Sequence, residues 1–295
     1  MLQRSLNRIF LLLLIICLNA CASLTSKDTN DALGLLWLIE KPGIAPSYVF
    51  GTVHSEDPRV TTIPHEVATR LDGADTVAFE VMLDGSSSKE AGRAMFFTDG
   101  SDLKKTIGIE LYAQAVEAMK RNNVDENIVN MMKPWAIFVT LNMPVQKTGL
   151  FLDVILFNEA KKKSKKLIGL EEIMEQVGAL AGMSYEDQTI LLKSTLLEVE
   201  KNEEFMDEIM EVYLTKDLQK IHEQYGEYLQ TIEPRVAKIF NQRLLIARNH
   251  RMVDRMQEML QQGNAFVAVG ALHLPGEEGI LNLLRLQDYN ISSIY

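Results

Sequence analysis

The chain has 295 residues, of which 47% are hydrophobic, enough for a substantial core in one large α/β domain or two smaller ones. Its formal net charge of −10 argues against nucleic acids and anionic lipid headgroups as partners. Both cysteines lie within the first 21 residues, which excludes a disulfide framework in the rest of the chain.

The first twenty residues have the features of an export signal. Arg4 and Arg8 supply its positive charge, and Phe10–Leu18 is an apolar stretch too short to span a bilayer comfortably. The segment ends in Leu-Asn-Ala-Cys at residues 18–21, which resembles a bacterial lipobox and makes Cys21 the expected acylated N-terminus. The alternative is an ordinary signal peptide with a coincidental cysteine, and both readings place the protein outside the cytoplasm.

The expected location is therefore the cell envelope, with acyl chains on Cys21 inserted in a membrane leaflet. Ala22 stands where an inner-membrane retention signal prefers aspartate, which favours the outer membrane facing the periplasm. Residues 21–33 are predicted to form a polar tether. Residues 34–295 are predicted to form a single domain with a helical insertion over about 103–262.

Strand patterns stand near both ends of the chain. Leu35–Glu40 and Ser47–Thr52 predict a hairpin across the turn "KPGIAP". A short helix is expected at Pro64–Leu71 and a buried strand, "TVAFEV", at Thr76–Val81. Towards the C-terminus the sequence predicts a strand at Ala265–Val269, a helix at Gly279–Leu286 and a last strand at Asn290–Tyr295.

Helical spacing of apolar residues dominates the middle, from Leu103 to Met143 and from Glu171 to Gln262. Between these stretches, Leu167–Leu170 is a brief apolar run that a sheet would accept. Strands separated by helices favour crossover connections. The expected fold class is therefore mixed α/β, with a central, partly parallel sheet built from both chain ends and a large helical lobe from the middle.

Ligand-type side chains stand at four of the predicted strand ends. They are His54, Glu80, Glu171 and His273. In sheets of this class, ligands bind beyond the carboxyl ends of the strands. Two imidazoles and two carboxylates there suit a divalent metal such as Zn, Mn, Co or Fe, with open positions for water.

Both histidines close a GxxH pattern, "GTVH" at 51–54 and "GALH" at 270–273. Gly51 and Gly270 are expected to let the backbone leave the strand at dihedrals that a side chain would forbid, or to bring the main chain close to a ligand. A single histidine after a strand is usually a packed or surface residue, so the repetition in matching strand contexts carries the signal. Glu80 has the alternative of facing solvent, although the apolar residues before it indicate a buried strand.

The two GxxH patterns occur with "TVAFE", "PWAIFVTL", "GLFLDVILFNEAKKKSKKLIGLEE", "LLIARNHRM" and "FVAVGALHLPGEEGILNLL". In this order the motifs resemble those of the TraB/GumN family, related to the animal TIKI proteases, over roughly residues 35–295. The resemblance implies an EreA/ChaN-like fold and a metal-dependent hydrolase of the peptidase or amidase class that uses Mn, Co or Zn.

Carried over by motif, His54 and His273 match the family's GxxH histidines and Glu80 matches its glutamate, which together make the predicted metal ligands. Arg248 and Asn249 match an "RN" pair, and Asp153 matches a position in "GLFLDV". Glu171 matches the "GLE" motif, where Glu172 replaces the threonine that often follows, so its role is less defined.

The predicted chemistry assigns roles to these residues. The metal would lower the pKa of bound water and polarise a carbonyl, while Glu80 or Glu171 takes the proton from that water. Arg248 would stabilise the oxyanion or hold a substrate carboxylate, or else form a helix-surface ion pair. Asn249 and Asp153 would support the ligands from behind.

Other conspicuous residues receive ordinary interpretations. His65 and His222 lack the strand-end context, and His250 is kept only as a neighbour of the site. The lysine-rich run 161–166 is interpreted as a solvated helix end, since no aromatic residues interleave it. The helical methionines are interpreted as core filling rather than a peptide-binding groove.

Two hypotheses of function remain open at this point. The first is a lipid-anchored metal-dependent hydrolase acting on a peptide-like substrate. The second is a non-catalytic accessory lipoprotein that binds peptide or polysaccharide in an export, conjugation or cell-envelope system.

Overall fold

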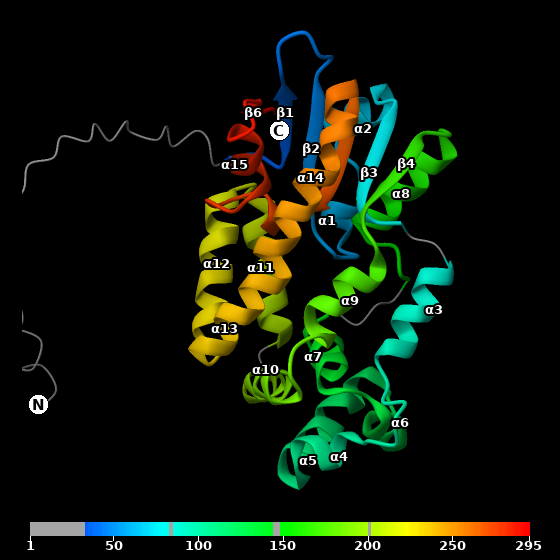
Figure 1. The fold of residues 1–295 in the computed structure, drawn as a ribbon, viewed down its shortest axis with the longest axis vertical. Helices are drawn as coiled ribbons and strands as arrows, with labels where there is room; N and C mark the ends of the chain where they lie inside the picture. The colour runs from blue at the N-terminus through cyan, green and yellow to red at the C-terminus, as the bar shows by residue number, and fades with distance from the viewer. Residues whose placement is uncertain (1–32, 83–84, 144–147, 200–201) are drawn as a thin grey trace, which may run out of the picture.

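The computed structural model describes residues 33–82, 85–143, 148–199 and 202–295. The predicted signal, the Cys21 anchor and nearly all of the tether lie outside the described residues. Figure 1 shows a sheet in the upper half of the view and a group of helices below it. Among the described residues, no helix combines the length and apolar character needed to cross a bilayer.

The sheet has six strands in the order β4-β3-β5-β2-β1-β6. β4, β3, β5 and β2 run parallel to one another, whereas β1 is antiparallel to both β2 and β6. This arrangement confirms the mixed α/β class and the predicted hairpin. The strands are β1 (Leu36–Glu40), β2 (Ser47–Thr52), β3 (Thr76–Val81), β4 (Lys166–Glu171), β5 (Ala265–Gly270) and β6 (Asn290–Ser293).

The helices of the first half lie between β2 and β4. The predicted helix at Pro64–Leu71 is present as α2, but it begins one residue later and ends two residues later, because Pro64 is its N-cap with extended dihedrals. Among the described residues these helices are α1 (Pro58–Thr61), α2 (His65–Gly73), α3 (Gly85–Ala94), α4 (Leu103–Ile107), α5 (Ile109–Met119), the 3₁₀ turn η2 (Lys120–Asn122), α6 (Glu126–Met131), α7 (Pro134–Asn142) and α8 (Leu152–Lys162).

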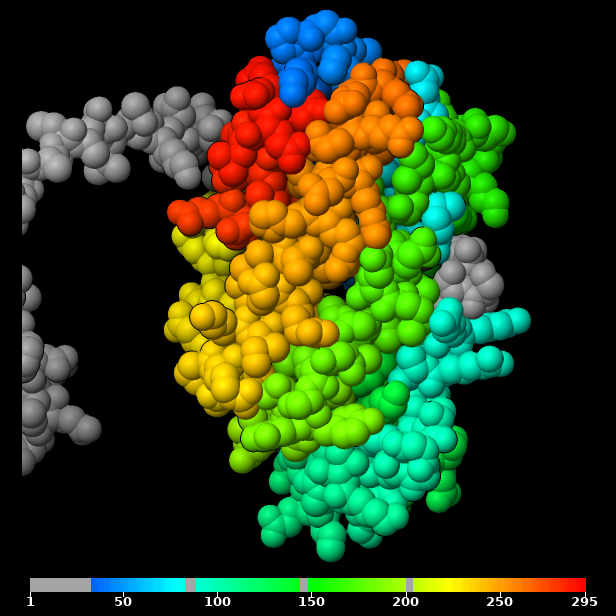
Figure 2. Space-filling model, in the orientation of Figure 1, coloured from blue at the N-terminus to red at the C-terminus, as the bar shows by residue number. Residues whose placement is uncertain are grey.

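The helices of the second half lie between β4 and the C-terminus. Helix α14 returns from the lobe to the sheet and covers much of it on the face seen in Figure 2. In the described part of this half the helices are α9 (Ile173–Ala181), α10 (Tyr185–Leu197), α11 (Asn202–Leu214), α12 (Leu218–Gln230), α13 (Pro234–Asn241), the π-helix η4 (Gln242–Ile246), α14 (Ala247–Gln262), the 3₁₀ turn η5 (Ala271–His273) and α15 (Ile280–Arg285).

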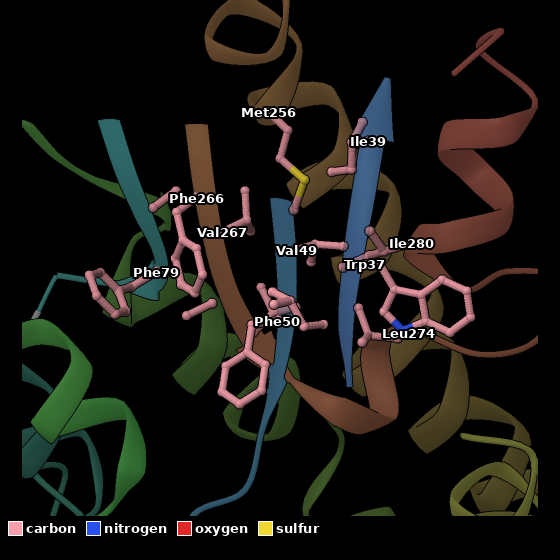
Figure 3. Packing of buried hydrophobic residues seen from close by; sticks show 14 of the residues in the cluster. Trp37, Ile39, Val49, Phe50, Phe79, Met256, Phe266, Val267, Leu274 and Ile280 are labelled. Atoms are coloured by element: carbon pink, nitrogen blue, oxygen red, sulfur yellow. The ribbon is translucent and has the colours of Figure 1, made fainter. Parts of the chain in front are cut away.

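Two hydrophobic clusters hold the molecule together. The first surrounds the sheet, with Trp37, Phe50 and Phe266 almost completely buried, and Figure 3 shows Met256 of α14 packed among the strand side chains. Met252, Met256 and Met259 all belong to it, as expected for core-filling methionines. The second cluster lies within the helical lobe and includes residues of α4, α5, α7, α10 and α13.

The register of the central strands places the two GxxH motifs side by side. β2 and β5 pair in parallel with Thr52 opposite Gly270. Because the two strands run in the same direction, His54 and His273 follow them at the same edge of the sheet. β5 also pairs with β3, which carries Glu80. The edge formed by the carboxyl ends of β2, β5, β3 and β4 is thus the candidate site.

Candidate functional site

Glu80 is the best-connected carboxylate of this edge. Its Oε1 accepts a hydrogen bond from the backbone N–H of Gly270 at 2.7 Å. Its Oε2 accepts from a terminal nitrogen of Arg248 at 2.7 Å and from Nε2 of Gln176 at 3.0 Å. Glu80 therefore points towards β5 and the helices, not to bulk solvent, which removes the alternative of a merely solvent-facing strand glutamate.

Glu171 lies at the end of β4, and its side chain is completely buried. Its Oε2 accepts from Nε of Arg248 at 2.9 Å, and its Oε1 accepts from Arg251 at 2.8 Å. Breaking such a buried pair leaves an uncompensated charge, at a cost of about 3–5 kcal/mol. The geometry thus assigns Glu171 to holding Arg248 and Arg251.

Arg248 is engaged on several sides. Besides the two carboxylates, its NH1 donates to the carbonyl oxygen of Leu244 at 3.3 Å. Leu244 belongs to the π-helix η4 directly before α14, and π-turns of this kind recur at functional sites. The guanidinium thus orients Glu80 and Glu171 in a largely buried ion pair, not the helix-surface pair considered as an alternative, and its oxyanion role stays a prediction.

The protonation of Glu80 and His273 follows from their surroundings. Burial opposes ionisation of Glu80, but the charge that His273 carries in acid, the charges of Arg248 and His54 and the Gly270 N–H hold the pKa of Glu80 well below its usual range. Burial lowers the pKa of His273 to about 4, although the negative charge of Glu80 acts in the opposite direction. His273 is therefore neutral near pH 7, and Arg248 is the fixed charge that keeps Glu80 ionised.

Asn249 determines which nitrogen of His273 carries the proton. Its Nδ2 donates to the backbone carbonyl of Glu278 at 2.7 Å, so its Oδ1 is the atom that faces Nδ1 of His273 at 2.5 Å. Nδ1 must then be the protonated nitrogen of the neutral ring. The unprotonated Nε2 faces Glu80, with 3.8 Å between Nε2 and Oε1.

His54 is supported in a similar way by a different helix. Asp153, in the first turn of α8, accepts from Nδ1 of His54 at 2.8 Å and from the hydroxyl of Thr52 at 2.5 Å. Desolvation works against the charged imidazole, but the hydrogen bond and charge of Asp153 outweigh it and raise the pKa of His54 to about 9. His54 is half exposed. Both histidines thus have Nδ1 engaged by a side-chain oxygen.

These contacts test whether the residues suit a divalent metal. Two ligands of one ion, each bonded at about 2.1 Å, stand roughly 3 to 3.6 Å apart. The 3.8 Å between His273 and Glu80 is close to that separation, and an Nδ1–H fixed by an acceptor is typical of metal-binding histidines. Across the described residues, no group of three or more His, Cys, Asp or Glu side chains stands close enough to hold an ion. His273 and Glu80 therefore fit as a ligand pair, and His54 would have to approach them.

The two motif glycines act through close packing, and the expected special dihedrals are not found. Neither has a positive φ, and Gly270 has φ −54° and ψ 136°. A Cβ on Gly51 would lie 3.0 Å from Cα of Ala271, and one on Gly270 would lie 3.2 Å from Oε1 of Glu80. The absence of a side chain lets η5 pack on β2 and lets Gly270 reach Glu80.

The sequence did not lead us to predict two residues of this site, Gln176 and Arg251. Gln176 of α9 bridges the two glutamates, donating to Glu171 at 3.2 Å as well as to Glu80. Arg251 was not predicted either. It lies three residues after Arg248, on the same face of the helix, and this spacing could have indicated that both arginines contact the site. His250 binds the carboxylate of Glu278 at 2.6 Å, beside the carbonyl that orients Asn249.

Comparisons with known proteins agree with the motifs. A sequence model of the TraB/PrgY/gumN family matches residues 35–293. The zebrafish (Danio rerio) metalloprotease TIKI2 is 23% identical over 90% of this chain, which spans 61% of that protein, and the Xenopus tropicalis metalloprotease TIKI1 is 22% identical over 90%, with 62% spanned. The uncharacterised protein YbaP of Shigella flexneri is 24% identical over 84% of this chain and 90% of its own length. No solved structure matches, so the EreA/ChaN likeness stays a prediction.

Proposed function

Because the chain belongs to the TraB/PrgY/gumN family, we propose that it is a divalent-metal-dependent hydrolase acting on peptide or amide bonds. One observation carries the proposal: a buried histidine presents an unprotonated Nε2 to an ionised carboxylate at the carboxyl edge of a parallel sheet. The distant resemblance to metalloproteases supports this class of reaction.

In the proposed reaction, His273 and Glu80 would hold the ion. His54 would be the third ligand after losing the proton on Nε2, since its raised pKa leaves the ring charged near pH 7. The metal, Mn, Co or Zn, supplies an acidified water and polarises the substrate carbonyl. Arg248 keeps Glu80 ionised and directs its Oε1 towards His273. Glu171 neutralises Arg248 and Arg251, and this contact supports a positioning role for one of the two glutamates between which the sequence left the proton acceptor open.

The first test measures metal retention. The metal-stripped protein is incubated with Mn, Co or Zn, and the bound metal is measured by mass spectrometry after gel filtration. We expect about one equivalent in the wild type and loss of that equivalent in His273→Ala and Glu80→Gln. The control is His65→Ala, an exposed histidine on α2 that leaves the site untouched.

The same preparations are then assayed against a peptide library. Cleavage that depends on the metal and on His273 supports a hydrolase. Equal retention of metal by the wild type and His273→Ala, without cleavage by either, would contradict the proposal and leave the accessory-lipoprotein hypothesis.

The proposed location is the cell envelope, with Cys21 acylated in the outer membrane and the domain facing the periplasm. The lipobox-like residues 18–21 and Ala22 support this location. We propose a peptide-like substrate and no nucleic-acid partner, which agrees with the net charge of −10.

A further inference from the structure

A short apolar segment lies directly beside His54. The ring of Phe151 meets the imidazole of His54 edge-on, with the ring centroids 5.3 Å apart and an interplanar angle of 75°. The preceding residue, Leu150, has 51% of its surface exposed. We call Leu150 and Phe151 the apolar lip.

The lip is held in place by an acidic side chain from the first motif's own loop. The carboxylate of Glu56, two residues after His54, accepts the backbone N–H of Thr148 at 3.0 Å and that of Gly149 at 2.5 Å. Gly149 has φ +73°, a conformation that side chains rarely adopt, which allows both N–H groups to reach one carboxylate. The hydroxyl of Thr148 then accepts from the N–H of Leu150 at 3.1 Å.

The other end of the lip is equally constrained. Phe151 is the N-cap residue of α8, and Asp153 in the first turn of that helix holds His54. The segment that contains Leu150 and Phe151 is therefore held at both ends. Glu56 binds its first residues, and Asp153, just after it, binds His54. Since the chain advances only about 3.5 Å per residue, the lip cannot move far without disturbing Asp153.

An exposed leucine is common on protein surfaces and by itself indicates no function. Leu150 is of interest because it precedes Phe151, whose ring contacts His54. The groups that face the catalytic edge from β3, β4 and α14 are charged, namely Glu80, Glu171 and Arg248. Phe151 adds an apolar surface on the His54 side of that edge, and Leu150 is the exposed apolar residue directly before it in the chain. A peptide whose reacting carbonyl lies near His54 would place its adjacent side chain about one residue length away, within reach of this surface.

We infer that the apolar lip selects the substrate, so that the enzyme prefers peptides with a large apolar side chain next to the bond that is cleaved. This inference rests on the proposed peptidase or amidase function. Burial of a leucine-sized side chain in such a contact should favour binding by about tenfold or more over a charged residue at that position.

The experiment compares Leu150→Asp with Leu286→Asp. Leu286 follows α15 and is 73% exposed, so it provides a matched change of an exposed leucine away from the site. Both proteins and the wild type are loaded with metal and given a combinatorial peptide library, and the cleaved bonds are identified by mass spectrometry. We expect enrichment of Leu, Phe and Met beside the cleaved bond for the wild type and Leu286→Asp, and loss of that enrichment for Leu150→Asp.

Single peptides then separate binding from chemistry. For a leucine-containing peptide, Leu150→Asp should raise KM about tenfold with kcat little changed. Glu56→Ala, which releases Thr148 and Gly149, should shift KM in the same direction, and Glu56→Asp should recover part of it. Cleavage without any apolar enrichment, or an equal effect of Leu286→Asp, would overturn the inference while leaving the hydrolase function intact.

A second arm needs no turnover. Peptides that carry a photoactivatable leucine are irradiated with the metal-free protein, and the cross-linked residues are mapped. Cross-links within residues 148–151 of the wild type that disappear in Leu150→Asp support the lip even if no peptide is cleaved, a result that would count against the proposed function alone. Cross-links confined to other segments would overturn the lip.

Discussion

Asn249 shows how one buried side chain sets the chemistry of another. It has no measurable exposure, and its amide is oriented by the carbonyl of Glu278. That orientation leaves only Oδ1 for His273, so the imidazole keeps its proton on Nδ1 and turns Nε2 towards Glu80. A fully buried residue thereby determines which nitrogen of His273 is free to bind a metal.

Replacement of this residue gives the first prediction. Asn249→Leu should weaken metal binding by about 10–100-fold, because the partner that fixes the histidine ring is lost. It should also destabilise the fold by about 1–3 kcal/mol, since Nδ1–H of His273 stays buried without an acceptor. Competition with a metal-sensitive dye and urea unfolding measure the two effects. Wild-type metal affinity in Asn249→Leu would show that the tautomer is set elsewhere.

The second prediction concerns acid stability of the metal-free protein. His273 has a pKa of about 4 in the fold and near 6.5 when unfolded, so between these values the unfolded chain binds more protons. Stability is therefore full above pH 6.5 and falls as the pH drops towards 4, by roughly 3 kcal/mol from this group. Urea unfolding in EDTA at pH 7 and pH 5 measures the fall.

The control for this pH dependence is His273→Asn, whose amide nitrogen replaces Nδ1–H as the donor to Asn249 but does not titrate. It should lose less stability than the wild type between pH 7 and pH 5. An identical pH dependence in both proteins would assign the acid sensitivity to other groups.

At the scale of elements, two consecutive residues of α14 contact the two parts of the site, the carboxylates and the buried histidine. Arg248 holds the carboxylates of β3 and β4, and Asn249 holds the histidine that follows β5. The π-helix η4 precedes this turn and changes the helical phase from which both side chains leave. The pairing of β2 with β5 then depends on how closely η5 can approach the strand.

This close approach gives the third prediction. Gly51→Ala should cost about 1–3 kcal/mol, because the new Cβ would stand 2.9 Å from Cδ1 of Leu274 and 3.0 Å from the backbone of Ala271. Gly226→Ala is the matched control: that helical glycine of α12 has open space around its Cβ position and should gain about 0.5–1 kcal/mol. Thermal melts of both variants test the sign of each change.

At the scale of the whole molecule, the strand order decides which motifs meet. β5, from the C-terminal part of the chain, inserts between β3 and β2, so the second GxxH motif lies between the strand of Glu80 and the strand of the first motif. The helical lobe has its own hydrophobic cluster, separate from the one around the sheet. The candidate site thus belongs to the sheet, while the lobe forms the lower half of the molecule (Figure 1).

The fourth prediction concerns where the whole molecule is held. Cys21→Ser should move the protein from the membrane fraction to the soluble periplasmic fraction of a two-membrane bacterium, because the acylated cysteine is removed. Fractionation followed by immunoblotting measures the shift, with Cys17→Ser, inside the predicted signal, as the control. Unchanged membrane association of Cys21→Ser would favour an ordinary signal peptide and another means of attachment.

The sequence by itself determined the elements and the candidate strand ends. Strands such as Thr76–Val81 and Ala265–Gly270 are apolar over a short run, and that local pattern reflects burial directly. The placing of His54, Glu80, Glu171 and His273 at one sheet edge followed from the general rule for parallel strands. The boundaries differed from the prediction by one or two residues, as at β6, which ends at Ser293.

Only the tertiary structure decided the partners of those residues. Glu80 meets Arg248 across 168 positions of sequence and His54 meets Asp153 across 99, and no local pattern specifies contacts at such distances. The same holds for Gln176, for the lip at Leu150 and for the close packing that explains Gly51. Local periodicity records whether a side chain is buried, whereas the choice of its partner depends on strand order and helix packing, which the whole chain settles together.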